Sequence, residues 1–221
     1  MLFKNRTTAG QTLARDLADY ANRSDVIVLG LPRGGVPVAF EVAKALKAPL
    51  DVVVVRKLGV PEQEELAMGA IASGGVRIIN EHIINQMNIS DDMIARVAVQ
   101  EERELERREL LYRGDRPFSD LKERTVILVD DGLATGATMW AAVASVRRQH
   151  PAQIVIAVPV ATTETCQELA TAVDKIVCAA TPSPFYSVGM WYKDFPQTTD
   201  DQVRHLLAKS ETNHQPLSLG T

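Results

Sequence analysis

Short, wholly apolar runs recur along this chain, and they constrain its fold more than any other feature. The clearest are residues 25–30, which end in Val-Ile-Val-Leu-Gly, and residues 125–129, which read Thr-Val-Ile-Leu-Val. A short run without alternating polar positions is typical of a strand that is buried on both faces. Similar runs predict further strands, at 51–56, 76–80, 154–158 and 175–178.

Segments with helical spacing separate these strands. In residues 8–21, Leu13, Leu17 and Tyr20 fall on one face of a helix. Further helices are predicted at 38–46, 91–112, 136–149, 163–172 and 199–209. The alternation predicts an α/β fold with a doubly wound, mostly parallel sheet. In such sheets ligands bind beyond the carboxyl ends of the strands.

The length of 221 residues suits a single domain, which we place at 1–210. Its core is expected at about 25–180, with a helical insertion at about 81–116. A small hood is expected from 1–24 and 181–200, and 211–221 is expected to be a disordered tail. The insertion carries the highly charged helix 91–112, which we interpret as a hood or dimer element, so we expect a homodimer.

Composition excludes several classes of protein. The formal net charge of −4 gives no general attraction to nucleic acid, and no apolar run approaches the length of a membrane span. Lys4 and Arg6 precede no apolar stretch, so no secretory signal is expected. Cys166 and Cys178 lack metal-ligand spacing, which favours inert thiols in a reducing compartment. We therefore expect a cytoplasmic protein that has no membrane partner and does not bind nucleic acid.

The stretch from Asp130 to Thr138 is the most informative motif. An apolar strand ends in two carboxylates, a turn of small residues follows, and a helix then begins. Exposed amides and hydroxyls at the start of a helix form a cradle for a phosphate group. Two adjacent acids at a strand end can accept hydrogen bonds from vicinal hydroxyls or hold a hydrated divalent cation. The pattern favours a sugar phosphate, and the alternative is a strand–turn–helix in which an Asp merely caps the helix.

This stretch resembles the signature of type I phosphoribosyltransferases for phosphoribosyl pyrophosphate (PRPP). The resemblance implies that Asp130 and Asp131 contact the ribose hydroxyls, act in catalysis and help to hold Mg²⁺, mainly through those hydroxyls or water. It implies that the turn binds the 5-phosphate, through residues Ala134, Thr135, Gly136, Ala137 and Thr138. The chain departs from the pattern at Gly132, where the family favours an apolar residue. Ala134 replaces an acid that hypoxanthine and guanine enzymes usually carry, which counts against that specificity.

Two cationic stretches follow the first two predicted strands. Leu31-Pro-Arg-Gly-Gly places Arg33 in a glycine-rich turn, and Arg56-Lys57 ends the strand 51–56. In the resembled family the first loop binds pyrophosphate, often through a strained peptide, and Arg33-Gly34 resembles it. The resemblance likewise implies that Arg56 and Lys57 bind pyrophosphate and act in catalysis. The alternatives are a solvent-facing Arg33 and an exposed strand end. Because carboxyl ends of parallel strands share one edge, we expect residues 32–37, 56–75 and 130–138 to converge.

Residues 57–75 contain four further glycines and a proline, and we interpret them as mostly loop, with a helical turn near 64–68. The stretch would correspond to the mobile loop that closes over the site in the resembled family. In orotate-type enzymes of that family this loop is basic, whereas here it carries Glu62, Glu64 and Glu65. These acids fit a solvated turn or a contact with a partner subunit.

The base-binding residues are the weakest part of the pattern. Phe185, Trp191 and Asp194 lie in the predicted hood and loosely resemble the stacking and acidic positions of hypoxanthine-type enzymes. The alternative is that the aromatic residues cap the core.

The pattern over about 25–178, with LPRGG and RKLG, is similar to bacterial phosphoribosyltransferases of unassigned substrate. The resemblance implies Mg²⁺-dependent transfer of 5-phosphoribose from PRPP to a nitrogenous base, a purine among the candidates, with release of pyrophosphate. The alternative is a non-catalytic regulator that senses PRPP or a nucleotide with the same fold. A nucleotide-binding P-loop protein is disfavoured because no GxxxxGK[ST] sequence is present.

Overall fold

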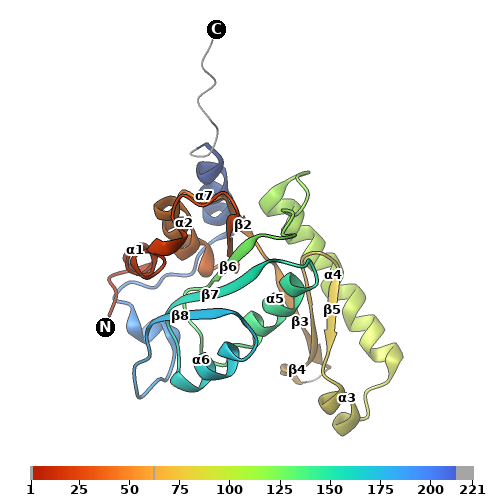
Figure 1. The fold of residues 1–221 in the computed structure, drawn as a ribbon. Helices are drawn as coiled ribbons and strands as arrows, with labels where there is room; N and C mark the ends of the chain where they lie inside the picture. Colours follow the sequence, from red (N-terminus) through yellow and green to blue (C-terminus); the bar gives the residue numbers. More distant parts are fainter. Residues whose placement is uncertain (1, 62, 213–221) are drawn as a thin grey trace.

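A five-stranded parallel sheet forms the centre of the molecule (Figure 1). The structure, a computed structural model, describes residues 2–61 and 63–212. The sheet order is β2-β1-β6-β7-β8, and every neighbouring pair is parallel. The strands are β1 (Val26–Gly30), β2 (Leu50–Val52), β6 (Thr125–Val129), β7 (Gln153–Val160) and β8 (Lys175–Ala180). The predicted fold class is therefore confirmed.

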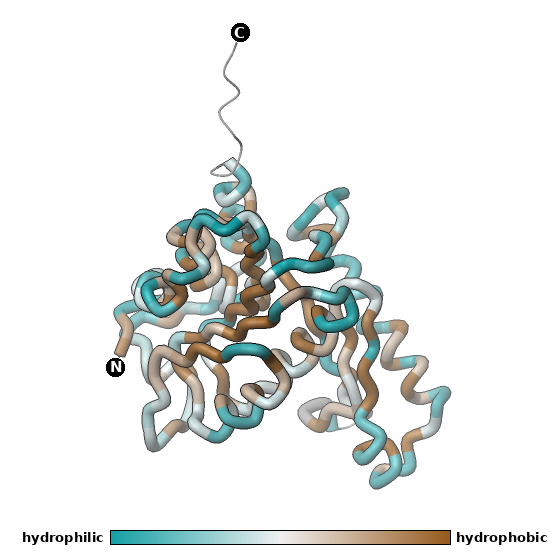
Figure 2. The backbone as a smooth tube through the Cα atoms, in the orientation of Figure 1, coloured by the Kyte–Doolittle hydropathy of each residue, from teal (hydrophilic) through white to brown (hydrophobic). Residues whose placement is uncertain are grey.

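Helices cover both faces of this sheet. On one face α1 (Arg6–Asp16) and α2 (Gly35–Leu46) pack against alternate strand residues such as Val28 and Ile127. On the other face α5 (Ala137–Arg147) and α6 (Thr163–Ala170) pack against the intervening residues, such as Leu29 and Leu128. Because every residue of β1 and β6 is buried, both strands are apolar throughout, as Figure 2 shows for the central strands.

The stretch predicted to be a loop with a helical turn forms a second, antiparallel sheet instead. Its strands are β3 (Val55–Val60), β4 (Gln63–Ala72) and β5 (Val76–Ile79), in the order β3-β4-β5. The glycines favour a loop in the sequence, but one of them lies within a strand and lets two strands approach closely. A Cβ atom at Gly69 would lie only 2.4 Å from the carbonyl oxygen of Ile78.

The predicted strand 51–56 is in fact divided between the two sheets. Strand β2 ends at Val52, and β3 begins at Val55. Val52, Val53 and Val54 are all buried, so hydrophobicity alone could not reveal the break. The amide of Val54 leaves the parallel sheet and donates to Ser73 Oγ at 2.9 Å.

The charged insertion forms α3 (Glu81–Met87) and the long helix α4 (Asp91–Arg113). Ser90 caps α4, and its side chain accepts a hydrogen bond from the amide of Met93. The apolar stripe of α4 packs on β3, β4 and the last helix, α7 (Asp200–Thr212). The predicted tail beyond Thr212 lies outside the described residues.

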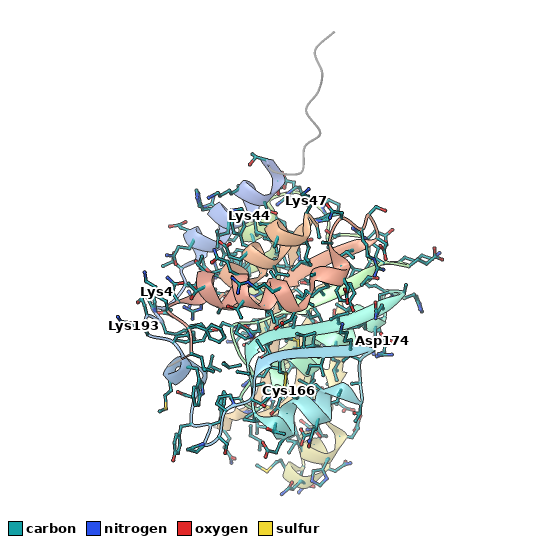
Figure 3. All side chains as sticks on the ribbon, turned by 60° about the vertical axis from the view of Figure 1, so that its left-hand side comes forward. Lys4, Lys44, Lys47, Cys166, Asp174 and Lys193 are labelled. Atoms are coloured by element: carbon teal, nitrogen blue, oxygen red, sulfur yellow. A yellow bond between two sulfur atoms is a disulfide. The ribbon has the colours of Figure 1, made fainter. Side chains whose placement is uncertain are left out.

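Residues near the N-terminus pair with residues 193–194 in the predicted hood. Backbone hydrogen bonds join Lys193 to Phe3 at 2.9 Å and Asp194 to Lys4 at 2.9 Å, and Figure 3 shows Lys4 beside Lys193. Two 3₁₀ turns, η1 (Ala18–Tyr20) and η2 (Val188–Trp191), complete the secondary structure of this region. None of the helices in the described part of the chain is long and apolar enough to cross a bilayer.

The prediction of two free thiols was wrong. Cys166 of α6 and Cys178 of β8 form a disulfide, with an S–S distance of 2.10 Å (Figure 3). The pairing could not be foreseen from spacing, because it depends on α6 folding back over β8.

A buried ion pair fastens α4 to the sheet. Arg113 Nε donates to Asp51 Oδ1 at 2.9 Å, and the Arg113 side chain is 4% exposed. Asp51 also accepts a hydrogen bond from Ser119 Oγ at 2.7 Å. Since the Arg113 guanidinium lies 4.7 Å from the centre of the Phe118 ring, the pair is shielded from water.

We predict that Arg113→Gln lowers the free energy of unfolding by about 3–5 kcal/mol, because Asp51 is left buried without its cation. The matched control is Arg77→Gln, which breaks a 3.0 Å pair with Glu102 in which both side chains are at least 40% exposed. That change should cost less than about 1 kcal/mol. Urea unfolding measures both, and equal losses would contradict the structural role of the buried pair.

Candidate active site at the carboxyl edge of the sheet

Asp130 and Asp131 follow β6 directly at the carboxyl edge of the parallel sheet. The strands on either side stay attached to this region, since Leu31 donates to Val129 O and Leu133 donates to Val160 O, each at 2.9 Å. The two acids therefore stand on a rigid base at the edge where α/β proteins bind ligands.

Each acid has one engaged and one unengaged carboxylate oxygen. Asp130 Oδ1 accepts a hydrogen bond from the amide of Asp131 at 2.8 Å, and Asp131 Oδ2 accepts from Arg6 Nε at 2.9 Å. Within the described residues, Asp130 Oδ2 and Asp131 Oδ1 accept none. Neither is among the buried side-chain atoms that lack a partner, which are Gln149 Nε2 and Trp191 Nε1. Both free oxygens therefore retain contact with solvent.

The surroundings of the pair disfavour two bare negative charges. Burial, together with the neighbouring charge of Asp131, raises the pKa of Asp130 well above its ordinary value. Burial also raises the pKa of Asp131, and the Arg6 guanidinium offsets part of that effect. Groups that supply hydrogen-bond donors or positive charge are therefore favoured ligands for the pair.

The turn after the acids presents unused amides. Ala134 and Thr135 are exposed, and Gly136 adopts a left-handed conformation with φ of 69° at the start of α5. Within the described residues, no backbone carbonyl accepts a hydrogen bond from the amides of 135–138. These are the unpaired donors expected at a helix N-terminus, where an anion binds well.

Helix α6 supports this turn from behind. Thr165 Oγ1 donates to the carbonyl of Ala134 at 2.6 Å, and the amide of Thr162 donates to the carbonyl of Leu133 at 3.3 Å. A Cβ atom at Gly136 would lie 2.8 Å from Thr165 Cγ2, so glycine is required there for space as well as for its φ angle.

The glycine-rich turn after β1 lies directly against the acids. A Cβ atom at Gly34 would lie 2.1 Å from Asp131 Oδ2, and one at Gly35 would lie 2.8 Å from the Cα atom of Asp130. The peptide bond between Pro32 and Arg33 is cis, one residue before the Arg33-Gly34 peptide singled out in the sequence. The predicted convergence of these two loops is confirmed.

Arg33 extends from this turn toward α7. Its side chain is 34% exposed, and its Nη1 lies 4.0 Å from Asp200 Oδ1. The same oxygen of Asp200 accepts a hydrogen bond from the hydroxyl of Tyr112 at 2.6 Å. Arg33 is therefore loosely paired and partly open to solvent, beside a glycine turn that touches the acids.

The model of the phosphoribosyl transferase domain matches residues 3–180 of this sequence. This chain belongs to the phosphoribosyl transferase family. Proteins from two strains of Mycobacterium tuberculosis, described as "Putative phosphoribosyl transferase" Rv0571c and MT0597, are each 48% identical to it over 204 residues. The match covers 91% of this chain but 45% of each relative, so the chain spans about half of their length.

A solved structure of similar length also matches this member of the family. TT1426 from Thermus thermophilus is 40% identical, with a TM-score of 0.82. The match covers 95% of this chain and 99% of TT1426. The arrangement of the parallel sheet and the antiparallel sheet is therefore shared along almost the whole of both chains.

The prediction that Arg56 and Lys57 end a strand of the parallel sheet was wrong. Both lie near the start of β3 in the antiparallel sheet, because β2 stops at Val52. Arg56 Nε donates to Glu101 Oε2 of α4 at 2.6 Å, and Lys57 is exposed. Their role in binding pyrophosphate remains a prediction. Glu62 and the side chains of Glu64 and Glu65 lie outside the described residues, so the acidic stretch also stays a prediction.

The hood aromatic residues pack together. The rings of Phe185 and Trp191 are 6.2 Å apart, and both contact a small core that includes Phe3 and Tyr192. This packing favours the alternative that the aromatic residues cap the core. Asp194 is exposed and lies with Arg6 on the wall of a cavity of about 530 Å³ between α1, α2 and α7.

The hood also fills the space beside Gly132, where the sequence departs from the family pattern. A Cβ atom at Gly132 would lie 2.5 Å from Val188 Cγ1 and 2.9 Å from Val160 Cγ2. The glycine is thus matched to the turn η2 that passes over it.

Sequence reasoning missed the residues that hold the acids from outside the motif. Arg6 binds Asp131 Oδ2, and the hydroxyl of Tyr192 donates to the carbonyl of Asp131 at 2.6 Å. Burial raises the pKa of Tyr192, so its hydroxyl remains a donor at neutral pH. Two further residues were missed: Thr165, which bonds the turn at Ala134, and Asp200, which faces Arg33. No local signal marks these residues, because each contact spans distant segments.

We predict that Gly34→Ala lowers the free energy of unfolding by about 1–3 kcal/mol. The new methyl group would meet Asp131 Oδ2, which cannot move without breaking its bond to Arg6. Gly75→Asn is the control, because nothing lies within 4 Å of a Cβ there and Asn tolerates its φ of 72°. Urea unfolding should show a control within about 0.5 kcal/mol of the wild type. A Gly34→Ala protein as stable as the control would refute the tight contact.

Proposed function

We propose that this chain transfers 5-phosphoribose from PRPP to a nitrogenous base and releases pyrophosphate. One observation carries the proposal: two acids with one free oxygen each stand directly before a turn of unpaired amides. Two neighbouring acceptors suit the vicinal hydroxyls of ribose, and the turn suits a phosphate monoester. Phosphate alone would not require the acids.

The roles follow from this placement. Asp130 Oδ2 and Asp131 Oδ1 accept hydrogen bonds from the ribose hydroxyls, and the turn 134–138 holds the 5-phosphate. The raised pKa of Asp130 supports this role. The surroundings disfavour a second bare negative charge, and a ribose hydroxyl that donates a hydrogen bond to Asp130 would stabilise that charge. The amides of 135–138 have no carbonyl partner within the described residues, so phosphate binding breaks no backbone hydrogen bond there.

Pyrophosphate is expected to leave toward the glycine-rich turn. Arg33 stands in this turn and is partly exposed, with only a 4.0 Å contact to Asp200. A loosely paired cation stabilises the charge that develops on the leaving group. Arg56 and Lys57 would add to this if the antiparallel sheet brings them toward the same side, as the family resemblance implies.

The residues present fit Mg²⁺. Among the side chains that the structure describes, which exclude those of residues 62, 64 and 65, no group of three or more His, Cys, Asp or Glu could hold a metal by itself. Mg²⁺ is usually bound by one or two carboxylates together with substrate phosphates and water, and Asp130 and Asp131 supply two carboxylates. When bound, the ion would neutralise charge on the pyrophosphate.

A PRPP-sensing regulator with the same fold is the second candidate. The packing of Phe185 and Trp191 against each other and against the hood core favours it, because it gives these rings a structural role without a base. The two functions differ in turnover. The chain is therefore incubated with PRPP, Mg²⁺ and single purines or pyrimidines, and pyrophosphate is measured. We expect base-dependent release with at least one base, with purines as first candidates. PRPP binding without release for any base would favour the sensor.

We predict that Asp130→Asn together with Asp131→Asn weakens PRPP binding by at least about 100-fold, since each carboxylate is replaced by a neutral amide that is a weaker acceptor and can present a donor instead. The overall fold should be kept, because both side chains lie at the edge of the sheet. Isothermal titration calorimetry measures the affinity, and circular dichroism checks the fold. As a control, Asp115→Asn changes an exposed acid beyond the end of α4 and should bind PRPP normally. An unchanged affinity in the double variant would defeat the assignment of the ribose site.

A further inference from the structure

Among the described residues, Arg6 is the cation in direct contact with the acid pair. Its Nε and Nη2 lie 2.9 Å and 2.8 Å from Asp131, and both contact the same oxygen, Oδ2. That oxygen also faces Gly34, so it is enclosed from two sides. The other oxygen, Oδ1, has no hydrogen-bond partner in the part of the chain that the structure describes. Arg6 therefore decides which oxygen of Asp131 points toward a ligand.

Arg6 is itself fixed by the hood. Its Nη1 donates to the carbonyl of Pro196 at 2.6 Å, and its guanidinium lies 3.7 Å from the centre of the Phe195 ring. The side chain is 11% exposed. An arginine stacked on a ring and bonded at three nitrogens has little rotational freedom, in contrast to an ordinary surface arginine.

The backbone of Arg6 is equally constrained. Arg6 is the first residue of α1, and Asn5 and Thr8 form a reciprocal capping box there. The residues just before it are bonded to the hood, since Lys193 donates to Phe3 O and Asp194 donates to Lys4 O. The guanidinium thus connects three segments that are far apart in the sequence: the start of α1, residues 195–196 and the end of β6.

We propose that Arg6 is a positioning residue of the ribose site: it fixes Asp131 so that Oδ1 alone is offered to a ribose hydroxyl. The inference rests on the proposed function, and it extends the site to a residue outside every motif. Asp130 is oriented differently, by the amide of Asp131 on its Oδ1. Two independent contacts thereby orient the two free oxygens: the backbone amide of Asp131 orients Asp130, and the Arg6 side chain orients Asp131.

The variant Arg6→Gln tests the proposal because it removes the cation and keeps a long polar side chain. Affinities for ribose 5-phosphate and for inorganic phosphate are measured by calorimetry with the full chain. We expect ribose 5-phosphate to bind about 10- to 100-fold more weakly, by analogy with the loss of a residue that orients a metal ligand. Inorganic phosphate, which needs only the turn 134–138, should change by less than about twofold.

Two further variants separate positioning from general damage. Arg15→Gln removes an exposed arginine from the same helix and should leave both affinities unchanged. Arg6→Lys keeps a donor for Asp131 Oδ2 and should recover part of the ribose 5-phosphate affinity. Equal weakening of both ligands in Arg6→Gln, or no weakening of either, would overturn the proposal.

The same measurements on the wild-type chain test the proposed function separately. If it binds ribose 5-phosphate no more tightly than inorganic phosphate, the ribose assignment of the acids fails before Arg6 is considered. If it prefers ribose 5-phosphate and Arg6→Gln retains that preference, the acids keep their role and only the positioning role of Arg6 is lost.

Discussion

The burial of β6 on both faces is the constraint on which the rest of the structure depends. All five residues of this strand are buried between β1 and β7 and beneath helices on either side. Inside such a strand an unpaired carboxylate would cost several kcal/mol, so charge is tolerated only where the strand ends. Asp130 and Asp131 stand at that point, and two turns and the hood assemble around them.

The parts of the fold that follow from local periodicity could be predicted from the sequence. The strands Val26–Gly30 and Thr125–Val129 are continuous apolar runs, and α4 begins at the Ser90 cap because the capping chemistry is local. The second sheet could not be predicted in this way. Its glycines resemble turn residues until the partner strand is known, and the valines from 52 to 54 are buried in either sheet.

The same distinction applies to the site. The acid pair, the phosphate turn and the glycine-rich turn are contiguous in sequence, and the structure brings the acids and the glycines into contact. Arg6 and Tyr192 reach Asp131 from segments that are far apart in the sequence, so their contacts depend on how those segments pack. The sequence also suggested free thiols, whereas Cys166 and Cys178 are joined across α6 and β8. Contacts between segments that are far apart in the sequence produce no periodic pattern in it.

The contact between Gly132 and Val188 limits how members of this family can diverge. Gly132 follows the acids, and the side chain of Val188 already occupies the volume that a larger residue there would need. The two positions are therefore coupled. A relative that carries the usual apolar residue after its acid pair must have a smaller residue in place of Val188, or a hood that follows another path. Covariation between these two positions would thus mark the subset of sequences whose hood is built as it is here.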